Sequence, residues 1–376
     1  MITLRVIVDE VTAAPNGGMA RYAEELTRQL IATAPRGSNV AGIVSASPEP
    51  DYALLAERLP GLVELYKSPL ARRELAAAWA HGFTRLPGAG MVHATSLLAP
   101  MHRHLPVSGR NDQTVVTVHD AIAWTDPELL SSRQVSWNRA MTKRAERFAD
   151  AVVAPTHAVA EVLAENFAFG DRLRVIGGAP SSRLRPLPDD TARRERLGLH
   201  GEYLLTVAGL DPRKGLDVLI DAMARVPGIA LVVVGAAEGD REGIADRARE
   251  RSIDTGRIIV LDQLDDDDLA AVLQGATAFL QASRAEGFGL ALVEAMAFGL
   301  PVIHSDAAAL VEVAADAGVV IARDDPDEAD GYAAAIREVL DDDELRGRLS
   351  VAARDRSRAF SWRDSAEKVW QLHADL

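Results

Sequence analysis

Glu-Gly-Phe-Gly-Leu-Ala-Leu-Val-Glu occupies residues 286–294 and continues as Ala-Met-Ala-Phe-Gly-Leu-Pro-Val-Ile to residue 303. Gly287 and Gly289 allow a tight backbone turn, after which the free amide groups of a helix start can face an anion. Glu286 then stays in the loop, while Glu294 lies about one turn into the helix. Two carboxylates on either side of an anion site predict a ligand with a polyol at each end. The alternative is that the acids are ordinary charges near a helix N-terminus and that the glycines only end a strand.

On both sides of this segment, short apolar runs alternate with helical patterns, which predicts parallel sheets. Leu231-Val232-Val233-Val234 is apolar without interruption, as expected for a strand buried on both faces. The predicted strands are residues 5–8, 40–44, 115–118, 151–154, 204–207, 230–234, 258–261 and 302–303. We therefore predict an α/β protein with two Rossmann-like, doubly wound parallel-sheet domains.

Prolines 180, 186 and 188 precede a charged stretch before the next strand, so we place the boundary between the domains there. The N-terminal domain is expected to span residues 1–182 and the C-terminal domain residues 183–360. Ser361 is the expected N-cap of a last amphipathic helix, residues 361–376, with Asp364 in its first turn.

The segment from Glu286 to Glu294 resembles the Glu-x7-Glu signature of retaining glycosyltransferases of family four, which have the GT-B fold. The resemblance extends over most of the chain and is most specific between residues 203 and 312. It implies two domains facing a cleft, with the last helix crossing back onto the first domain. It also implies that Glu286 binds donor-sugar hydroxyls, that residues 287–290 (Gly287, Phe288, Gly289 and Leu290) face the diphosphate, and that Glu294 binds the ribose. One departure is Gly177-Gly178-Ala179-Pro180, where many relatives have Pro-Asn-Gly.

Cationic and polar residues follow other predicted strands. Arg213 and Lys214 match the family's phosphate-binding pair, although alone they would indicate an exposed turn. Gly17, Gly18 and Arg21 resemble the family's Gly-Gly-x-x-Arg loop, for which a plain loop with an exposed arginine is the alternative. His119 and Asp120 match the family's His-Asp pair, with His119 expected to contact the donor sugar or acceptor and Asp120 to orient its ring, whereas a lone histidine is more often structural. His93 is a further acceptor-side candidate.

The resemblance implies transfer of a hexose, of the mannose or glucose type, from a UDP- or GDP-sugar with retained anomeric configuration. Arg213, Lys214, Glu286 and His119 would carry the reaction, and no cofactor or metal ion would be needed. The expected acceptor is a hydroxyl of a glycan, a lipid-linked sugar or a small molecule, in cell-envelope or exopolysaccharide synthesis. Alternatives are a non-catalytic carbohydrate- or nucleotide-binding subunit and a nucleotide-sugar epimerase with the same fold. A dehydrogenase is disfavoured because Gly-x-Gly-x-x-Gly is missing after the first strand.

Composition limits the partners. The 376 residues carry a net charge of -14, which disfavours nucleic acid, and contain no cysteine. The N-terminal apolar stretch is too short for a secretory signal, so we expect cytoplasmic residence. The acidic runs at 265–268 and 341–343 are interpreted as charges at helix N-termini rather than metal ligands. Arginines and lysines between residues 132 and 148, with Trp137 and Met141 among them, indicate either a solvated helix face or a peripheral contact with the inner face of a membrane.

Overall fold

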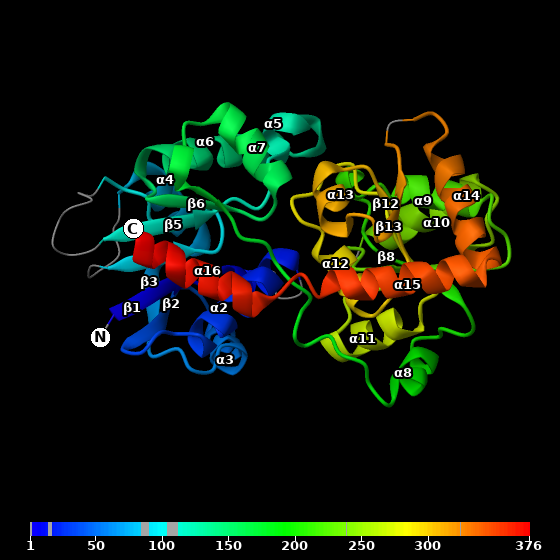
Figure 1. Ribbon diagram of the computed structural model, residues 1–376, viewed down its shortest axis with the longest axis horizontal. Helices are drawn as coiled ribbons and strands as arrows, with labels where there is room; N and C mark the ends of the chain where they lie inside the picture. The colour runs from blue at the N-terminus through cyan, green and yellow to red at the C-terminus, as the bar shows by residue number, and fades with distance from the viewer. Residues whose placement is uncertain (1, 14–16, 84–89, 104–111, 238, 324) are drawn as a thin grey trace. The chain divides into compact units, whose positions relative to one another are not determined.

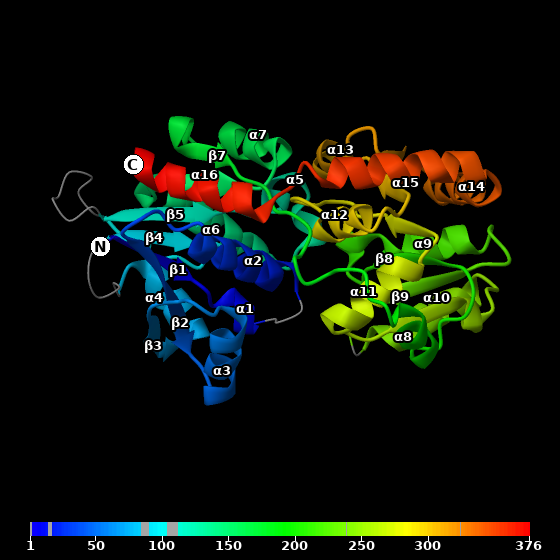
Figure 2. The ribbon, with the colours of Figure 1, turned by 60° about the horizontal axis from the view of Figure 1, so that its bottom comes forward.

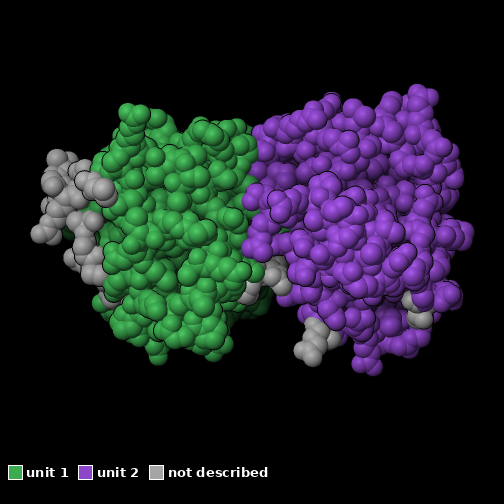
Figure 3. All heavy atoms as spheres, turned by 90° about the horizontal axis from the view of Figure 1, so that it is seen from below, with its two compact units in different colours: residues 1–178, 361–376 green, residues 179–360 purple. Residues whose placement is uncertain are grey.

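The computed structural model describes residues 2–13, 17–83, 90–103, 112–237, 239–323 and 325–376. The chain forms two compact units, coloured separately in Figure 3: residues 1–178 with 361–376, and residues 179–360. The first unit therefore ends at residue 178, four residues before the boundary predicted at 182.

Unit 1 contains, among its described residues, a parallel sheet in the order β3-β2-β1-β4-β5-β6-β7. The strands are β1 (Ile2–Ile7), β2 (Ser38–Ala46), β3 (Leu65–Ala71), β4 (Met91–Ala94), β5 (Gln113–Thr117), β6 (Ala151–Ala154) and β7 (Leu173–Val175). The helices are α1 (Glu10–Ala13), α2 (Gly18–Ala32), α3 (Glu49–Arg58), α4 (Arg72–His81), α5 (Ile122–Thr125), α6 (Ser132–Phe148), α7 (His157–Asn166) and α16 (Trp362–Asp375). They cover both faces of the sheet (Figures 1 and 2).

Unit 2 contains a second parallel sheet, in the order β10-β9-β8-β11-β12-β13. Its strands are β8 (Tyr203–Val207), β9 (Ala230–Val234), β10 (Ile258–Leu261), β11 (Ala278–Gln281), β12 (Val302–Ser305) and β13 (Gly318–Ile321). Its helices are α8 (Asp190–Arg196), the 3-10 turn η3 (Pro212–Lys214), α9 (Leu216–Met223), α10 (Asp240–Glu250), α11 (Asp266–Gly275), α12 (Leu290–Ala297), α13 (Ala308–Ala314), α14 (Glu328–Asp341) and α15 (Asp343–Ser357). The predicted pair of doubly wound parallel sheets is thus confirmed.

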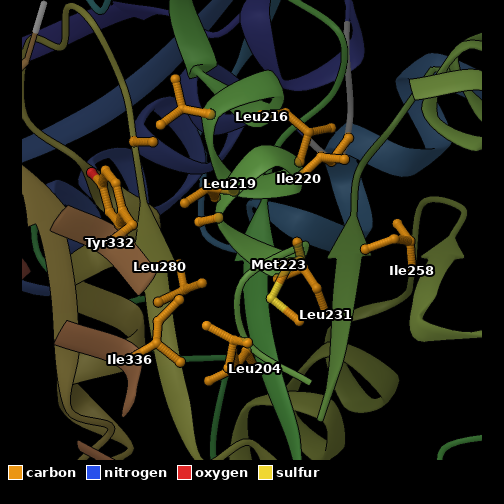
Figure 4. Close-up of a cluster of buried hydrophobic side chains, with 14 of the residues drawn as sticks. Leu204, Leu216, Leu219, Ile220, Met223, Leu231, Ile258, Leu280, Tyr332 and Ile336 are labelled. Atoms are coloured by element: carbon orange, nitrogen blue, oxygen red, sulfur yellow. The ribbon is translucent and has the colours of Figure 1, made fainter. Parts of the chain in front are cut away.

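The core of unit 2 lies on both sides of its sheet. On one side, buried side chains of α9 and α14 meet those of β8, β9 and β11 (Figure 4). Four consecutive residues of β9, Leu231 to Val234, are buried, as predicted for a strand with helices on both faces.

The last helix, α16, completes unit 1. Its N-cap is Ser361, whose hydroxyl accepts a hydrogen bond from the Asp364 amide at 3.3 Å. Trp370 Nε1 donates to the Leu30 carbonyl at 3.1 Å, and Ser365 Oγ donates to the Gly177 carbonyl at 2.8 Å. Figure 2 shows α16 running beside α2, from the opposite end of the sequence.

The acidic runs lie at helix starts. Asp265 is the N-cap of α11 and accepts from the Asp268 amide, and Asp342 caps α15 and accepts from the Leu345 amide. The prediction that these acids serve helix N-termini is confirmed for 265–268 and for Asp342 and Asp343, whereas Asp341 is the last residue of α14.

Candidate functional site

The carboxyl ends of two neighbouring strands of unit 2 bring a lysine and a glutamate together. Lys214 follows β8 and Glu286 follows β11, and these strands pair in the sheet. Lys214 Nζ lies 2.5 Å from Glu286 Oε1. Ligands of open α/β sheets bind outside the carboxyl ends of the strands, so this ion pair marks a candidate site.

The charge state of Glu286 follows from its surroundings. Burial alone raises the pKa of this carboxyl group, but the charges of Lys214 and Arg213 and hydrogen bonds from Lys214 and Ser283 lower the pKa below its ordinary value. Glu286 is therefore ionised at neutral pH. Arg213 pairs with the more exposed carboxylate of Asp211 at 3.4 Å, so both cations of this site have an acidic partner within unit 2.

The two loops that carry these residues are locked together. Gly215 has φ +61°, and a Cβ atom added there would lie 2.0 Å from the carbonyl oxygen of Ala282. The Arg284 amide donates to the Arg213 carbonyl at 2.8 Å. Only a glycine permits this close approach of backbones, so Gly215 fixes where Lys214 lies relative to Glu286.

Helix α12 begins directly after the glycine turn. Gly289 is its N-cap with φ +89°, and a Cβ there would lie 2.6 Å from Leu310 Cδ2. Leu290 is the first helical residue, and Glu294 follows within the next turn with only 6% of its surface exposed. Phe288 packs in the core against Phe360, with ring centroids 5.6 Å apart, so a ligand contact from Phe288 would come from its backbone. The backbone amides at the start of α12 form the positive end of the helix dipole, which favours an anion in front of the glycine turn.

The predicted residues of unit 1 lie around the end of β5. His119 Nε2 lies 2.7 Å from the Thr95 carbonyl, so Nε2 carries the proton and Nδ1 is a hydrogen-bond acceptor in the neutral ring. Burial lowers the pKa of His119, which favours that neutral form, although the Thr95 carbonyl and the Asp120 charge oppose the shift. The Asp120 carboxylate accepts from the Ile122 amide at 3.1 Å and thereby starts α5. The ring of His119 is thus held by Thr95, rather than by Asp120 as the sequence suggested.

The glycine turn of unit 1, at the start of α2, lies near His119. Gly17 is the N-cap of α2, Gly18 is its first residue, and the Arg21 amide donates to the Gly17 carbonyl at 3.0 Å. Tyr22, the next residue of α2, packs edge-on against His119 with ring centroids 4.6 Å apart. The start of α2 and the end of β5 are therefore neighbours within unit 1.

His93 requires a correction. It lies within β4 and is fully buried, with ring centroids of His93 and His373 on α16 separated by 5.7 Å. Alternation along the strand turns its side chain to the face that α16 covers. Without exposed surface, His93 is not an acceptor-side contact in this structure.

Sequence reasoning missed a polar cluster at the carboxyl ends of β1 to β4. Arg72 donates to the Asp9 carboxylate and, at 2.8 Å, to Glu10 Oε1, which also accepts from Ser96 Oγ at 2.8 Å. The Ser45 amide donates to Asp9 Oδ1 at 2.7 Å. Asp9 and Glu10 are 2% and 7% exposed, which is unusual for carboxylates and shows that Arg72 compensates their burial. Ser96 directly follows Thr95, whose carbonyl holds the ring of His119, so this cluster and His119 contact adjacent residues of the loop after β4.

Among the residues that the structure describes, no three His, Asp or Glu side chains are grouped to hold a metal ion. Two doubly wound parallel sheets, one of which carries cations, a carboxylate and a glycine-initiated helix at its carboxyl edge, are the arrangement of the GT-B class of proteins.

Comparison with known families agrees with this class. Residues 189–356 match the model of "Glycosyl transferases group 1", and residues 16–179 match that of "Glycosyltransferase Family 4". The chain belongs to the family 4 glycosyltransferases with the GT-B fold.

Individual proteins show how far the similarity extends. The chain is 34% identical over 170 residues to a phosphatidyl-myo-inositol mannosyltransferase of Mycolicibacterium smegmatis, a match that covers 43% of this chain and 42% of the relative. It is 32% identical over 243 residues to a D-inositol 3-phosphate glycosyltransferase of Xylanimonas cellulosilytica, covering 60% of this chain and 57% of the relative. The match thus spans about half the length of these curated relatives. Among solved structures, Anabaena HepE in complex with UDP and glucose superposes with a TM-score of 0.76 at 18% identity, with both chains covered to 100%.

No helix in the described part of the chain combines the length and the apolar character needed to cross a bilayer.

Proposed function

We propose that this protein transfers a hexose of the mannose or glucose type from a UDP- or GDP-sugar to an acceptor hydroxyl, with retention of anomeric configuration. The observation that carries the proposal is the Lys214–Glu286 ion pair of 2.5 Å beside Arg213 and the start of α12. Cations and helix amides fit a diphosphate, and a carboxylate with a lowered pKa fits the hydroxyls of a sugar.

Stabilisation of the leaving group is the main catalytic effect in this proposal. As the glycosidic bond breaks, negative charge grows on the departing diphosphate. Arg213, Lys214 and the α12 amides therefore stabilise the transition state more strongly than they stabilise the bound substrate. Glu286 orients the sugar and Glu294 the ribose. These cations and amides supply the positive charge, so we expect transfer without a divalent metal ion, and without a cofactor.

The neutral His119 ring presents Nδ1 as an acceptor, which suits a sugar hydroxyl and does not suit a phosphate. We assign His119 to a hydroxyl contact with donor or acceptor. Gly17, Gly18 and Arg21 at the start of α2 would bind an anionic part of either substrate.

The acceptor class follows from the cluster of Arg72 with Asp9 and Glu10. The names of two relatives specify a phosphatidyl-myo-inositol and an inositol phosphate. In this chain Arg72 is already neutralised by two buried carboxylates, and the three groups sum to -1. We therefore propose an uncharged polyol, such as the sugar end of a glycan or lipid-linked glycan, at the reacting end of the acceptor, in cell-envelope or exopolysaccharide synthesis.

A peripheral membrane contact through α6 would depend on charge alone. Met141 is buried, Trp137 packs against the core of unit 1, and Arg139 and Arg144 donate to carbonyls of their own unit. The exposed basic residues that remain include Arg133, Lys143 and Arg147. Co-sedimentation with vesicles containing anionic lipid, compared between the wild type and Lys143→Glu/Arg147→Glu, tests this contact, and equal sedimentation would eliminate it.

The test of the main proposal is nucleotide release from UDP-, GDP- and ADP-sugars in EDTA, with and without oligosaccharide and inositol-phosphate acceptors. We expect one donor to be consumed, more rapidly with an uncharged acceptor, and Arg213→Ala to lower kcat/KM about 100-fold. Arg348→Ala is the matched control, since it removes an arginine of an exposed ion pair with Glu344.

Two results would replace the proposal. Donor binding without turnover under every condition would indicate a non-catalytic subunit. Conversion of the donor sugar without acceptor glycosylation would indicate an epimerase.

A further inference from the structure

Gln281, the last residue of β11, donates a hydrogen bond from its side-chain amide to the carboxylate of Glu286. Its Nε2 lies 3.2 Å from Glu286 Oε1 and 3.3 Å from Ser283 Oγ. Ser283 Oγ in turn donates to Glu286 Oε1 at 3.0 Å. A Cβ added at Gly289 would lie 3.8 Å from the same Nε2, so the amide is also next to the turn that opens α12.

The orientation of the Gln281 amide follows from the hydrogen bonds that a carboxylate can form. An ionised carboxylate only accepts hydrogen bonds, so the nitrogen of Gln281 must face Glu286 and the amide oxygen must point away. That oxygen is buried and has no hydrogen-bond partner among the described residues, and Gln281 as a whole is 7% exposed. A buried amide oxygen without a partner lowers stability, so stability alone does not explain a glutamine at this position.

The donors on Glu286 are distributed unequally. Lys214 Nζ, Gln281 Nε2 and Ser283 Oγ all reach Oε1, and Oε2 accepts no hydrogen bond from the described residues. The carboxylate thus has one oxygen saturated by the protein and the other open.

We propose that Gln281 is a positioning residue, which holds Glu286 so that Oε2 alone is presented to hydroxyls of the donor sugar. The inference depends on the proposed function, because it assigns a cause to the sugar contact of Glu286. Gln281 itself touches no reacting atom. Its removal should weaken binding of the sugar moiety and leave binding of the bare nucleotide unchanged.

The variant Gln281→Met keeps the length of the side chain and removes both the nitrogen and the oxygen of the amide. The measurement is the Kd of a nucleotide and of the matching nucleotide sugar, UDP with UDP-glucose and GDP with GDP-mannose, together with the Tm of each protein without ligand. We expect the nucleotide-sugar Kd to rise about tenfold, as for loss of one hydrogen bond to a charged group, with the nucleotide Kd unchanged. The Tm should change little, because the loss of the hydrogen bond to Glu286 and the removal of the unpaired oxygen act in opposite directions.

Two further variants separate positioning from packing. Gln281→Glu places a second carboxylate beside Glu286 and should weaken sugar binding more than Gln281→Met. Tyr332→Phe is the matched control, because Tyr332 Oη donates to the Gln281 backbone carbonyl at 3.2 Å and its loss leaves the amide in place. This control should change Tm and not the ratio of the two Kd values.

Equal nucleotide-sugar affinity in wild type and Gln281→Met, or a fall in Tm with both affinities reduced in parallel, would overturn the positioning role. Failure of the wild type to bind any nucleotide or nucleotide sugar would instead refute the proposed function and, with it, this assignment.

Discussion

Replacing Gly215 with alanine tests the way in which unit 2 assembles its site. The new Cβ would lie 2.0 Å from the Ala282 carbonyl oxygen, whereas a carbon and an oxygen without a bond normally approach to about 3.3 Å. The two loops must therefore separate by about 1 Å, because the obstructing atom belongs to the backbone and has no alternative rotamer.

The expected loss of stability has three sources. The left-handed conformation at φ +61° costs a residue with a Cβ about 1–2 kcal/mol. Loss of the hydrogen bond from the Arg284 amide to the Arg213 carbonyl costs about 1 kcal/mol. Repacking around the displaced loops adds about 1–3 kcal/mol, for a total of about 3–6 kcal/mol, which lowers the Tm of a unit of this size by roughly 6–24 °C.

The assay is thermal unfolding together with kcat/KM for the donor. Separation of Lys214 from Glu286 by about 1 Å should reduce kcat/KM roughly 100-fold. Gly347→Ala is the matched control: Gly347 lies within α15 and an added Cβ meets no atom within 4 Å, so this change should raise stability by about 0.5–1 kcal/mol. A Gly215→Ala protein with the Tm and kinetics of the wild type would refute the close approach of these loops.

Two other predictions concern buried ionisable groups. Lys214→Ala should destabilise the protein at neutral pH and lower kcat about 100-fold, because Glu286 loses the strongest partner of its charge. In a double-mutant cycle with Glu286→Gln, the losses of stability and of kcat should be non-additive. Additive losses would mean that Lys214 and Glu286 are not coupled. Burial lowers the pKa of His93 to about 3, with the charge of His373 contributing, and burial lowers the pKa of His373 to about 4. Both histidines therefore bind protons more readily in the unfolded chain than in the folded one. The stability that they contribute is present above about pH 6.5 and is lost as the pH falls toward 4. His93→Phe should reduce this loss by about 1.4 kcal/mol per pH unit, measured by urea unfolding at several pH values, and an unchanged slope would contradict the assignment.

The sequence predicted those parts of the fold in which one short segment contains the whole signal. Continuous apolar runs such as Leu231 to Val234 identified buried strands, and the glycine-rich segment after Glu286 identified the helix start. Strand β11 was missed because its four residues, Ala278 to Gln281, end in a polar side chain. Strand β3 contains Ser68 and Pro69 and pairs with an irregular register at the edge of the sheet.

The cluster of Asp9, Glu10 and Arg72 could not be predicted in the same way. Arg72 is 63 residues from Asp9, and Ser96 is 86 residues from Glu10. Only the strand order β3-β2-β1-β4 brings these positions to one edge. The position of His93 depends on the same kind of information, since its partner His373 is in a helix at the other end of the chain.

The return of α16 to unit 1 also has a consequence for how the protein is made. Residues 361–376 are synthesised after the whole of unit 2, yet Trp370 and Ser365 form hydrogen bonds with the Leu30 and Gly177 carbonyls of the first unit. Unit 2 is a continuous segment, residues 179–360, so it can finish folding before residues 361–376 are made, whereas unit 1 stays incomplete until they are. A premature stop near residue 360 would therefore damage the half of the protein that was synthesised first.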